Sequence, residues 1–192
     1  MKNSKLLQGV EFSHYLLTEF VENGDFVVDA TTGNGYDTVF MAKLVGESGK
    51  VMGFDIQSDA INATGERLKK EGLFDRVKLI KDGHENMEEY LNDKEKASAV
   101  IFNLGYLPGG DKNIVTRPET TIYALKNSLK YLKRGGLVII VVYIGHDGGP
   151  EEKEALLKYT SELDQDDYNV LHYHYINQPT KPPEVIAIKK RR

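Results

Sequence analysis

A short glycine-containing loop carries the residue types and spacing in this chain that are best suited to chemistry. The apolar run Phe26–Val28 ends at Asp29, a small flexible segment with Gly33 and Gly35 follows, and apolar periodicity resumes at Val39. This pattern predicts a buried strand, a tight turn and the start of a helix. Glycines let a backbone approach a ligand closely, and a helix start offers unpaired N–H groups. The loop is therefore suited to hold a small polar cofactor, although a purely structural turn has the same pattern.

The spacing of the glycines separates two classes of cofactor. A dinucleotide-binding loop reads G-x-G-x-x-G, and the third glycine position is Thr38 here. An acid at the strand end, four residues before the first glycine, resembles the first motif of class I S-adenosylmethionine (SAM) methyltransferases. That resemblance implies a loop that wraps the methionine part of SAM. The residues that it assigns to cofactor binding are Asp29, Thr31, Gly33, Asn34, Gly35, Asp37 and Thr38.

An acid at the end of the next predicted strand is a second candidate for cofactor binding. Asp55 ends the run Val51–Phe54 and follows Gly35 by twenty residues, the span of one helix and one strand. An acid at this place accepts hydrogen bonds from both hydroxyls of a ribose. The alternative interpretation makes Asp55 a cap for the helix that begins near Ser58. We favour ribose binding, because Ser58 itself is a better capping residue.

Three further residues complete the predicted cofactor site. Gln57 follows Asp55 closely enough to contact the adenine or the ribose. In class I methyltransferases the turn after the third strand brings backbone and a polar side chain to the adenine amine, and the resemblance assigns Gly83 and His84 to this role. An Asp-Gly pair is also a common plain turn, so this assignment depends on the resemblance.

The segment Asn103–Asp111 follows the fourth predicted strand and carries the candidate catalytic residues. Strand carboxyl ends line the ligand crevice of an open α/β sheet, so this segment lies across from the glycine loop. Its first four residues keep the spacing of the [DNS]-P-P-[YFW] motif of amino-group methyltransferases, with Leu104 and Gly105 in place of the prolines. In that motif, lone-pair acceptors hold the target amine, and an aromatic ring packs on the substrate. Asn103 and Tyr106 are thus predicted to be catalytic. Asn103 is also predicted to contact the cofactor, and residues 104–106 to bind the substrate. The alternative is that this segment is a glycine-rich surface turn without a function in catalysis.

A second flexible loop, Tyr143–Pro150, leaves the fifth predicted strand at the same sheet edge. Its His146 can take the proton that an attacking amine loses, directly or through water. A structural role, capping the helix after Pro150, is the alternative. Three basic residues on loops near the crevice are candidates for contact with the phosphates of a substrate, or else are ordinary solvated charges. They are Lys112, Arg117 and Lys181.

These loops require alternating strands and helices to position them. Helices are expected at Ser4–Val21, Tyr36–Val45, Ala60–Gly72, Met87–Leu91, Ile122–Leu132 and Glu151–Leu163, and strands at Phe26–Asp29, Val51–Asp55, Arg76–Lys81, Ala97–Phe102, Leu137–Val142, Tyr168–Ile176 and Glu184–Lys189. The last two strands have a connection too short for a helix, which predicts an antiparallel pair. We therefore expect an α/β, Rossmann-like class I methyltransferase fold, with a seven-stranded, mostly parallel sheet and helices on both faces.

Length and composition set outer bounds on function. The chain has 192 residues and no linker-like segment, so we expect one domain over residues 1–192, with an N-terminal helix in residues 1–24 packed on it. It has no cysteine, which excludes disulfides and thiol nucleophiles, and we expect no metal site at His172 and His174. No apolar run is long enough to span a bilayer, so we expect a cytoplasmic protein without membrane contact. A net charge of −4 leaves room only for a local basic patch.

The motifs DATTGNGYDT, GFDIQ, FNLGYLPGGDK, VVYIGHDGG and INQPTKPPEVIAI occur in this order over nearly the whole chain. With them the chain resembles the YtqB-like family of class I SAM-dependent methyltransferases, first described as rRNA methylases. The resemblance implies SAM as cofactor and the anticodon region of tRNA as partner, with methylation of 5-aminomethyluridine at the wobble position to 5-methylaminomethyluridine.

Several alternatives stay open at this stage. In one alternative, the methyl acceptor is another RNA, such as rRNA, or a small-molecule amine. In another, the chain binds SAM without catalysing a reaction. A NAD-binding dehydrogenase is disfavoured by the missing third glycine and by the terminal strand pair. A homodimer is compatible with the sequence.

Overall fold

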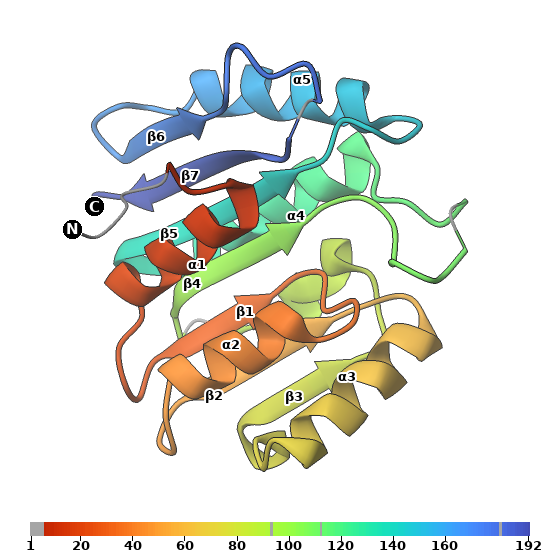
Figure 1. Cartoon of the computed structure of the whole chain (residues 1–192). Helices are drawn as coiled ribbons and strands as arrows, with labels where there is room; N and C mark the ends of the chain where they lie inside the picture. Colours follow the sequence, from red (N-terminus) through yellow and green to blue (C-terminus); the bar gives the residue numbers. More distant parts are fainter. Residues whose placement is uncertain (1–5, 93, 112, 181) are drawn as a thin grey trace, which may run out of the picture.

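A seven-stranded sheet runs through the molecule (Figure 1). The computed structural model describes residues 6–92, 94–111, 113–180 and 182–192. The strands, in the order β3-β2-β1-β4-β5-β7-β6, are β1 (Phe26–Asp29), β2 (Lys50–Phe54), β3 (Val77–Ile80), β4 (Ala97–Asn103), β5 (Leu132–Val142), β6 (Tyr168–Tyr173) and β7 (Glu184–Lys190). The five strands from β3 to β5 are parallel, and β7 is antiparallel to both β5 and β6. This arrangement confirms the predicted fold class.

Helices cover both faces of the sheet (Figure 1). The α-helices are α1 (Gly9–Phe20), α2 (Tyr36–Leu44), α3 (Ser58–Lys70), α4 (Pro118–Tyr131) and α5 (Gly149–Ser161), and the 3₁₀-helices are η1 (Phe74–Arg76) and η2 (His84–Glu89). Side chains of α1, α2 and α3 belong to one buried cluster, whereas α4, α5 and η2 contribute to the other. None of the helices in the described ranges is both long and apolar enough to cross a membrane.

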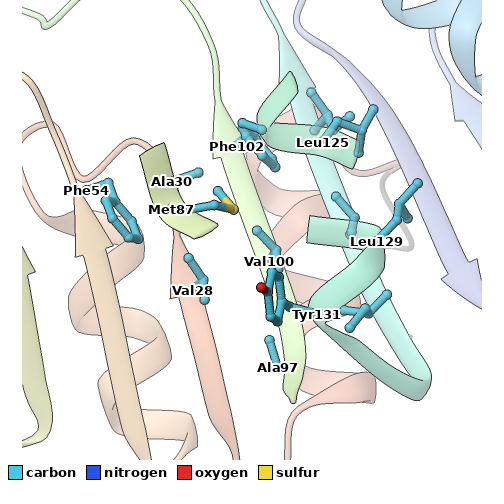
Figure 2. Close-up of a cluster of buried hydrophobic side chains, with 14 of the residues drawn as sticks. Val28, Ala30, Phe54, Met87, Ala97, Val100, Phe102, Leu125, Leu129 and Tyr131 are labelled. Atoms are coloured by element: carbon cyan, nitrogen blue, oxygen red, sulfur yellow. The ribbon is translucent and has the colours of Figure 1, made fainter. Parts of the chain in front are cut away.

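The two hydrophobic clusters follow from the alternation of side chains along each strand. In β5, Ile139 faces the cluster under α1 and α2, and its neighbour Ile140 faces the cluster under α4 and α5. Figure 2 shows the second cluster, in which Phe102 of β4 shares a face with Leu125 and Leu129 of α4. Each of these fully buried side chains contributes roughly 1.5–3 kcal/mol of burial free energy. The central strands are thus apolar on both faces, as buried parallel strands must be, whereas the edge strands β3 and β6 are partly exposed.

The N-terminal helix is shorter than predicted and ends differently. It begins at Gly9 rather than Ser4, and residues 1–5 lie outside the described ranges. The predicted glycine C-cap is wrong: α1 ends at Phe20, its C-cap residue Val21 is extended, and Gly24 forms the turn before β1. A β-carbon at Gly9 would lie 2.7 Å from the Pro183 carbonyl oxygen, so this helix start packs directly on the segment before β7.

Other element boundaries also differ from the prediction; for example, β6 ends at Tyr173 rather than Ile176. The segment predicted as a helix around Met87 is η2, a 3₁₀-helix that starts at His84. Strand β5 begins at Leu132, five residues early, because Leu132 pairs with Ala97 across a register shift before the apolar run begins at Leu137. Helix α4 starts at Pro118, the residue type that suits a first helical position.

Candidate active site

A cavity of about 860 Å³ opens at the carboxyl ends of β1, β2, β4 and β5. Most of the residues predicted for the site line it: Thr31, Gly33, Asn34, Asp37, Asp55, Gln57, Gly83, His84, Asn103, Leu104, Gly105, Tyr106, Arg117 and His146. We call residues 30–35 the cofactor loop and residues 103–111 the acceptor loop. The volume and position are those of a cofactor and substrate site in an open α/β sheet.

Some predicted site residues lie elsewhere. Asp29, Gly35 and Thr38 do not line the cavity; Asp29 and Thr38 are fully buried beneath the cofactor loop. Lys112 and Lys181 lie outside the described residues.

Asp29 braces the cofactor loop from below. Its Oδ1 accepts a hydrogen bond from the Thr31 backbone N–H at 3.1 Å, and its Oδ2 accepts one from the Thr38 hydroxyl at 2.6 Å. Burial, reinforced by the nearby negative charge of Asp37, raises the pKa of Asp29 to about 7. The acid at the strand end thus shapes the loop and adds an electrostatic demand for positive charge at the site.

The two predicted loop glycines both adopt positive φ angles. Gly33 has φ of +50° and Gly35 has φ of +80°. A β-carbon on Gly35 would lie 2.8 Å from the Thr64 hydroxyl oxygen, so only glycine lets α3 pack this closely. Thr64 also donates to the Gly33 carbonyl at 2.9 Å, and Arg67 Nε donates to the Asn34 carbonyl at 2.8 Å. The sequence analysis missed these two α3 residues because they look like ordinary positions of an amphipathic helix.

Asp55 connects the second strand to the cofactor loop. Its Oδ2 accepts from the Gly33 backbone N–H at 3.0 Å, and its Oδ1 accepts from the Gln57 N–H at 2.9 Å. Burial raises the pKa of Asp55. Each oxygen keeps a further lone-pair direction for a ligand hydroxyl. The capping alternative is not seen, because the N-cap of α3 is Gln57 and it has no side-chain cap.

His84 presents an unpaired acceptor inside the cavity. Burial lowers the pKa of His84, so the ring is neutral. The Nδ1–H then donates to the Ala30 carbonyl at 3.3 Å, and the buried Nε2 has no protein partner. The Thr32 hydroxyl oxygen, also on the cavity wall, is buried and unpaired in the same way. Buried polar atoms without partners are costly, so a bound water, or a ligand that reaches them after a small side-chain shift, would satisfy these two groups.

The acceptor loop is hydrogen bonded to the cofactor loop. The Asn103 backbone N–H donates to the Thr31 hydroxyl at 2.7 Å, and Asn34 Nδ2 donates to the Pro108 carbonyl at 3.2 Å. Tyr106 is 41% exposed and continues the cavity wall outward. A ligand group that binds to Asn103 is therefore held in a fixed position relative to the ligand of the cofactor loop.

His146 faces the acceptor loop with a free acceptor nitrogen. Its Nδ1 lies 2.9 Å from the Asp147 carbonyl oxygen, which fixes the proton on Nδ1 and leaves a lone pair on the buried, unpartnered Nε2. A β-carbon on Gly105 would lie 3.5 Å from that Nε2, and the Tyr106 ring meets the imidazole edge to face at 6.2 Å. The helix-capping alternative is not seen, because α5 has Gly148 as its N-cap.

A buried glutamate supports the acceptor loop, and the sequence analysis missed it. Glu152 accepts hydrogen bonds from the hydroxyls of Thr116 at 2.8 Å and Thr121 at 2.7 Å, and the Thr116 hydroxyl accepts one from the Gly105 N–H at 3.0 Å. Burial raises the pKa of Glu152. In the sequence it reads as a common first-turn acid of a helix. Arg117, the predicted RNA contact, is exposed at the cavity mouth.

The strand order, the glycine loop after β1, the acid after β2 and the acceptor loop after β4 together define a class I SAM-dependent methyltransferase. The chain belongs to the family described as "Putative rRNA methylase", whose model matches residues 51–189. SAM is its cofactor, and the family assignment removes the dehydrogenase alternative. A model for protein-L-isoaspartate O-methyltransferase also matches residues 8–91.

Individual relatives agree with this assignment. The chain is 40% identical, over 95% of its length and 70% of the relative's, to a chloroplastic tRNA (mnm(5)s(2)U34)-methyltransferase of Arabidopsis thaliana. The crystal structure of a putative rRNA-methylase from Clostridium thermocellum matches with a TM-score of 0.94 and 48% identity, over 97% of this chain and 99% of that one. A putative methyltransferase from Streptococcus mutans, in complex with SAH, matches with a TM-score of 0.88 and 38% identity, over 97% and 99%.

Proposed function

We propose that the protein transfers a methyl group from SAM to the aminomethyl nitrogen of 5-aminomethyluridine at the wobble position of tRNA, giving 5-methylaminomethyluridine. The observation that carries the proposal is the hydrogen bond between Asn103 and Thr31, which ties an amine-accepting side chain to the cofactor loop. The Arabidopsis relative, a tRNA (mnm(5)s(2)U34)-methyltransferase, supports a substrate of the same kind.

The residues present fit SAM. Gly33, Asn34 and Thr31 would surround its methionine part, and Asp55 its ribose hydroxyls. The unpaired His84 Nε2 offers an acceptor for the adenine amine. Bound SAM supplies an electrophilic methyl group on a positively charged sulfur, and the buried acids Asp29 and Asp55 favour positive charge nearby.

The acceptor nitrogen must be neutral to attack, because an ammonium has no lone pair. Asn103 Oδ1 and the Leu104 carbonyl accept hydrogen bonds from an NH₂ group without a full opposing charge, so they favour the free amine over the ammonium. Tyr106 packs on the uracil ring at the cavity mouth. As the nitrogen–carbon bond forms and the carbon–sulfur bond breaks, the nitrogen sheds a proton. Water accepts this proton, or His146 does once a loop movement exposes its buried Nε2.

The anticodon region of the tRNA lies over the mouth of the cavity in this proposal. Arg117 is exposed there and supplies one phosphate contact; Lys112 and Lys181 are further candidates by sequence alone. The chain's net charge of −4 predicts a small footprint of few phosphate contacts.

Mass spectrometry of tRNA nucleosides from cells that lack this protein tests the proposal. We expect 5-aminomethyl-type uridine to accumulate at the expense of its methylaminomethyl form, and a plasmid copy to restore the normal pattern. A normal tRNA profile together with the loss of a methyl group from rRNA would instead support the function that the family's description names.

A further inference from the structure

Three polar side chains from three separate elements meet in the cavity wall. His14 lies on α1, Asp37 in the first turn of α2, and Asn103 at the end of β4. The His14 Nε2 atom lies 2.6 Å from Asp37 Oδ1, and Asn103 Nδ2 donates to Asp37 Oδ2 at 2.9 Å. All three line the cavity, and Asp37 is buried. Each carboxylate oxygen of Asp37 therefore has its own donor.

The contact with Asp37 decides which way the Asn103 amide points. A carboxylate only accepts hydrogen bonds, so the NH₂ end of the amide must face Asp37. The carbonyl end, Oδ1, is then the end left to accept a bond from a ligand in the cavity that Asn103 lines. Without the carboxylate, the two ends of an amide are nearly equal in shape, and a flipped amide would present a donor to an acceptor amine. A flipped Asn103 would oppose the NH₂ group it has to hold.

His14 holds the carboxylate in place. Its ring stacks on Phe40 with the ring centres 4.0 Å apart and an angle of 7° between the planes. With the imidazole fixed in this way, the Nε2–H bond sets the rotation of the Asp37 carboxyl group. The N-terminal helix is thus coupled to the acceptor residue, two hydrogen bonds away.

The same contacts, together with burial, limit the pairing of Asp37 with the substrate in its unreactive form. An exposed, unpaired carboxylate near the acceptor would pair with an alkylammonium and stabilise it. Asp37 is buried, and each of its oxygens already accepts one hydrogen bond, from His14 or from Asn103.

We infer that His14 and Asp37 form a positioning pair that presents the Asn103 oxygen to the acceptor amine and excludes the opposite amide orientation. The inference rests on the proposed function for the identity of the acceptor. It gives Asp37, which the sequence analysis places among the cofactor contacts, a role on the acceptor side of the cavity, and it gives α1 a part in the reaction.

Single-turnover methyl transfer with saturating SAM and tRNA tests the pair. In Asp37→Asn, the new side-chain amide can either donate to Asn103 or accept from it, so the orientation of Asn103 is no longer fixed. The rate should therefore fall roughly tenfold to a hundredfold, while the Kd for SAM should stay within about threefold. His14→Ala should show a smaller loss in the same direction, and His14→Gln, which keeps an N–H donor, should recover most of the rate. Glu19→Ala, an exposed position on the same helix, is the matched control and should have the wild-type rate.

Two results would overturn the inference. A large rise in the Kd for SAM of Asp37→Asn, with an unchanged rate at saturation, would make Asp37 a cofactor ligand. Equal losses in His14→Ala and His14→Gln, accompanied by equal drops in melting temperature, would reduce His14 to a helix-packing residue.

An NMR measurement separates this inference from the identity of the substrate. In ¹⁵N-labelled protein, the side-chain NH₂ signal of Asn103, assigned by its loss in Asn103→Ala, should shift in Asp37→Asn and in His14→Ala but not in Glu19→Ala. If the Asn103 signal has the same chemical shift in Asp37→Asn as in the wild type, the inference about His14 and Asp37 is wrong, even if the protein methylates tRNA. A signal that shifts as expected, in a protein that leaves aminomethyluridine unmodified, would contradict the proposed function and keep the pair.

Discussion

The cofactor loop and the acceptor loop face each other across one cavity, but the protein supports them differently. The cofactor loop is held from beneath by Asp29, Asp55, Thr64 and Arg67 along most of its length. The acceptor loop is held at its base, where Thr116 meets Gly105, and by one hydrogen bond from Asn34 to the Pro108 carbonyl. Its side chains at Tyr106 and Pro108 are exposed. The cofactor is one small molecule, so the conformation of its loop can be preorganised. The acceptor loop must instead stay accessible to a large RNA.

Substitutions in the acceptor loop should have the largest effect, a loss of methyl transfer without a loss of SAM binding. We expect Asn103→Ala and Tyr106→Ala each to lower single-turnover methyl transfer by about a hundredfold or more, because the amine loses its oriented acceptor or its packing surface. SAM affinity, measured by calorimetry, should change little. Tyr123→Ala, an exposed tyrosine on α4, is the control. Wild-type rates in both variants would mean that the acceptor loop is misassigned.

Asp55→Ala should produce the reverse pattern. It removes the hydroxyl acceptor and the brace on the Gly33 N–H, with charge-assisted hydrogen bonds of about 1.5–3 kcal/mol at stake. The Kd for SAM should rise roughly tenfold or more, while the rate at saturating SAM falls much less. Unchanged SAM affinity in calorimetry would remove Asp55 from the cofactor site.

A pair of glycine substitutions compares the rigidity of the two loops directly. Gly35 and Gly109 both have positive φ angles, but a β-carbon on Gly35 meets Thr64, whereas nothing lies within 4 Å of one on Gly109. Gly109→Ala should cost about 1 kcal/mol of folding free energy from backbone strain alone, and Gly35→Ala should cost clearly more and weaken SAM binding. Chemical denaturation measures both. Equal costs would show that the close packing of α3 on the cofactor loop is unimportant.

The smallest expected effect is a pH dependence of stability that comes from Asp29. Its folded pKa of about 7 lies above its ordinary value of 3.8, so the folded state binds the proton more tightly than the unfolded state. The contribution of Asp29 to stability should therefore rise as the pH falls from about 8 toward 6. The difference in melting temperature between the wild type and Asp29→Asn isolates this term from His84, whose lowered pKa acts in the opposite direction. A difference that does not vary with pH would mean that Asp29 is ionised throughout this range.

The sequence predicted the fold and the positions of the two loops, because both follow from local patterns. Strand periodicity and the distance from Gly35 to Asp55 are set by a few neighbouring residues. The supports that come from distant elements were not predictable in this way. Thr64, Glu152 and His14 reach the site only through packing of whole helices, and each has an ordinary surface or helix pattern in the sequence.

The same distinction explains the errors. The end of α1 was misjudged because Gly24 serves the turn before β1, and β5 was predicted to start too late because its pairing with β4 begins before the apolar run. In both places a contact with a neighbouring strand or turn overrides the local signal.

Methyl transfer by the purified protein can be measured with SAM and two forms of one tRNA, with and without an aminomethyl group on the wobble uridine. We expect one methyl group to be transferred to the first form, on the aminomethyl nitrogen, and none to the second, with nucleoside mass spectrometry as the readout. Equal methylation of both forms, or a methyl group on a base carbon or a ribose, would contradict the proposed function.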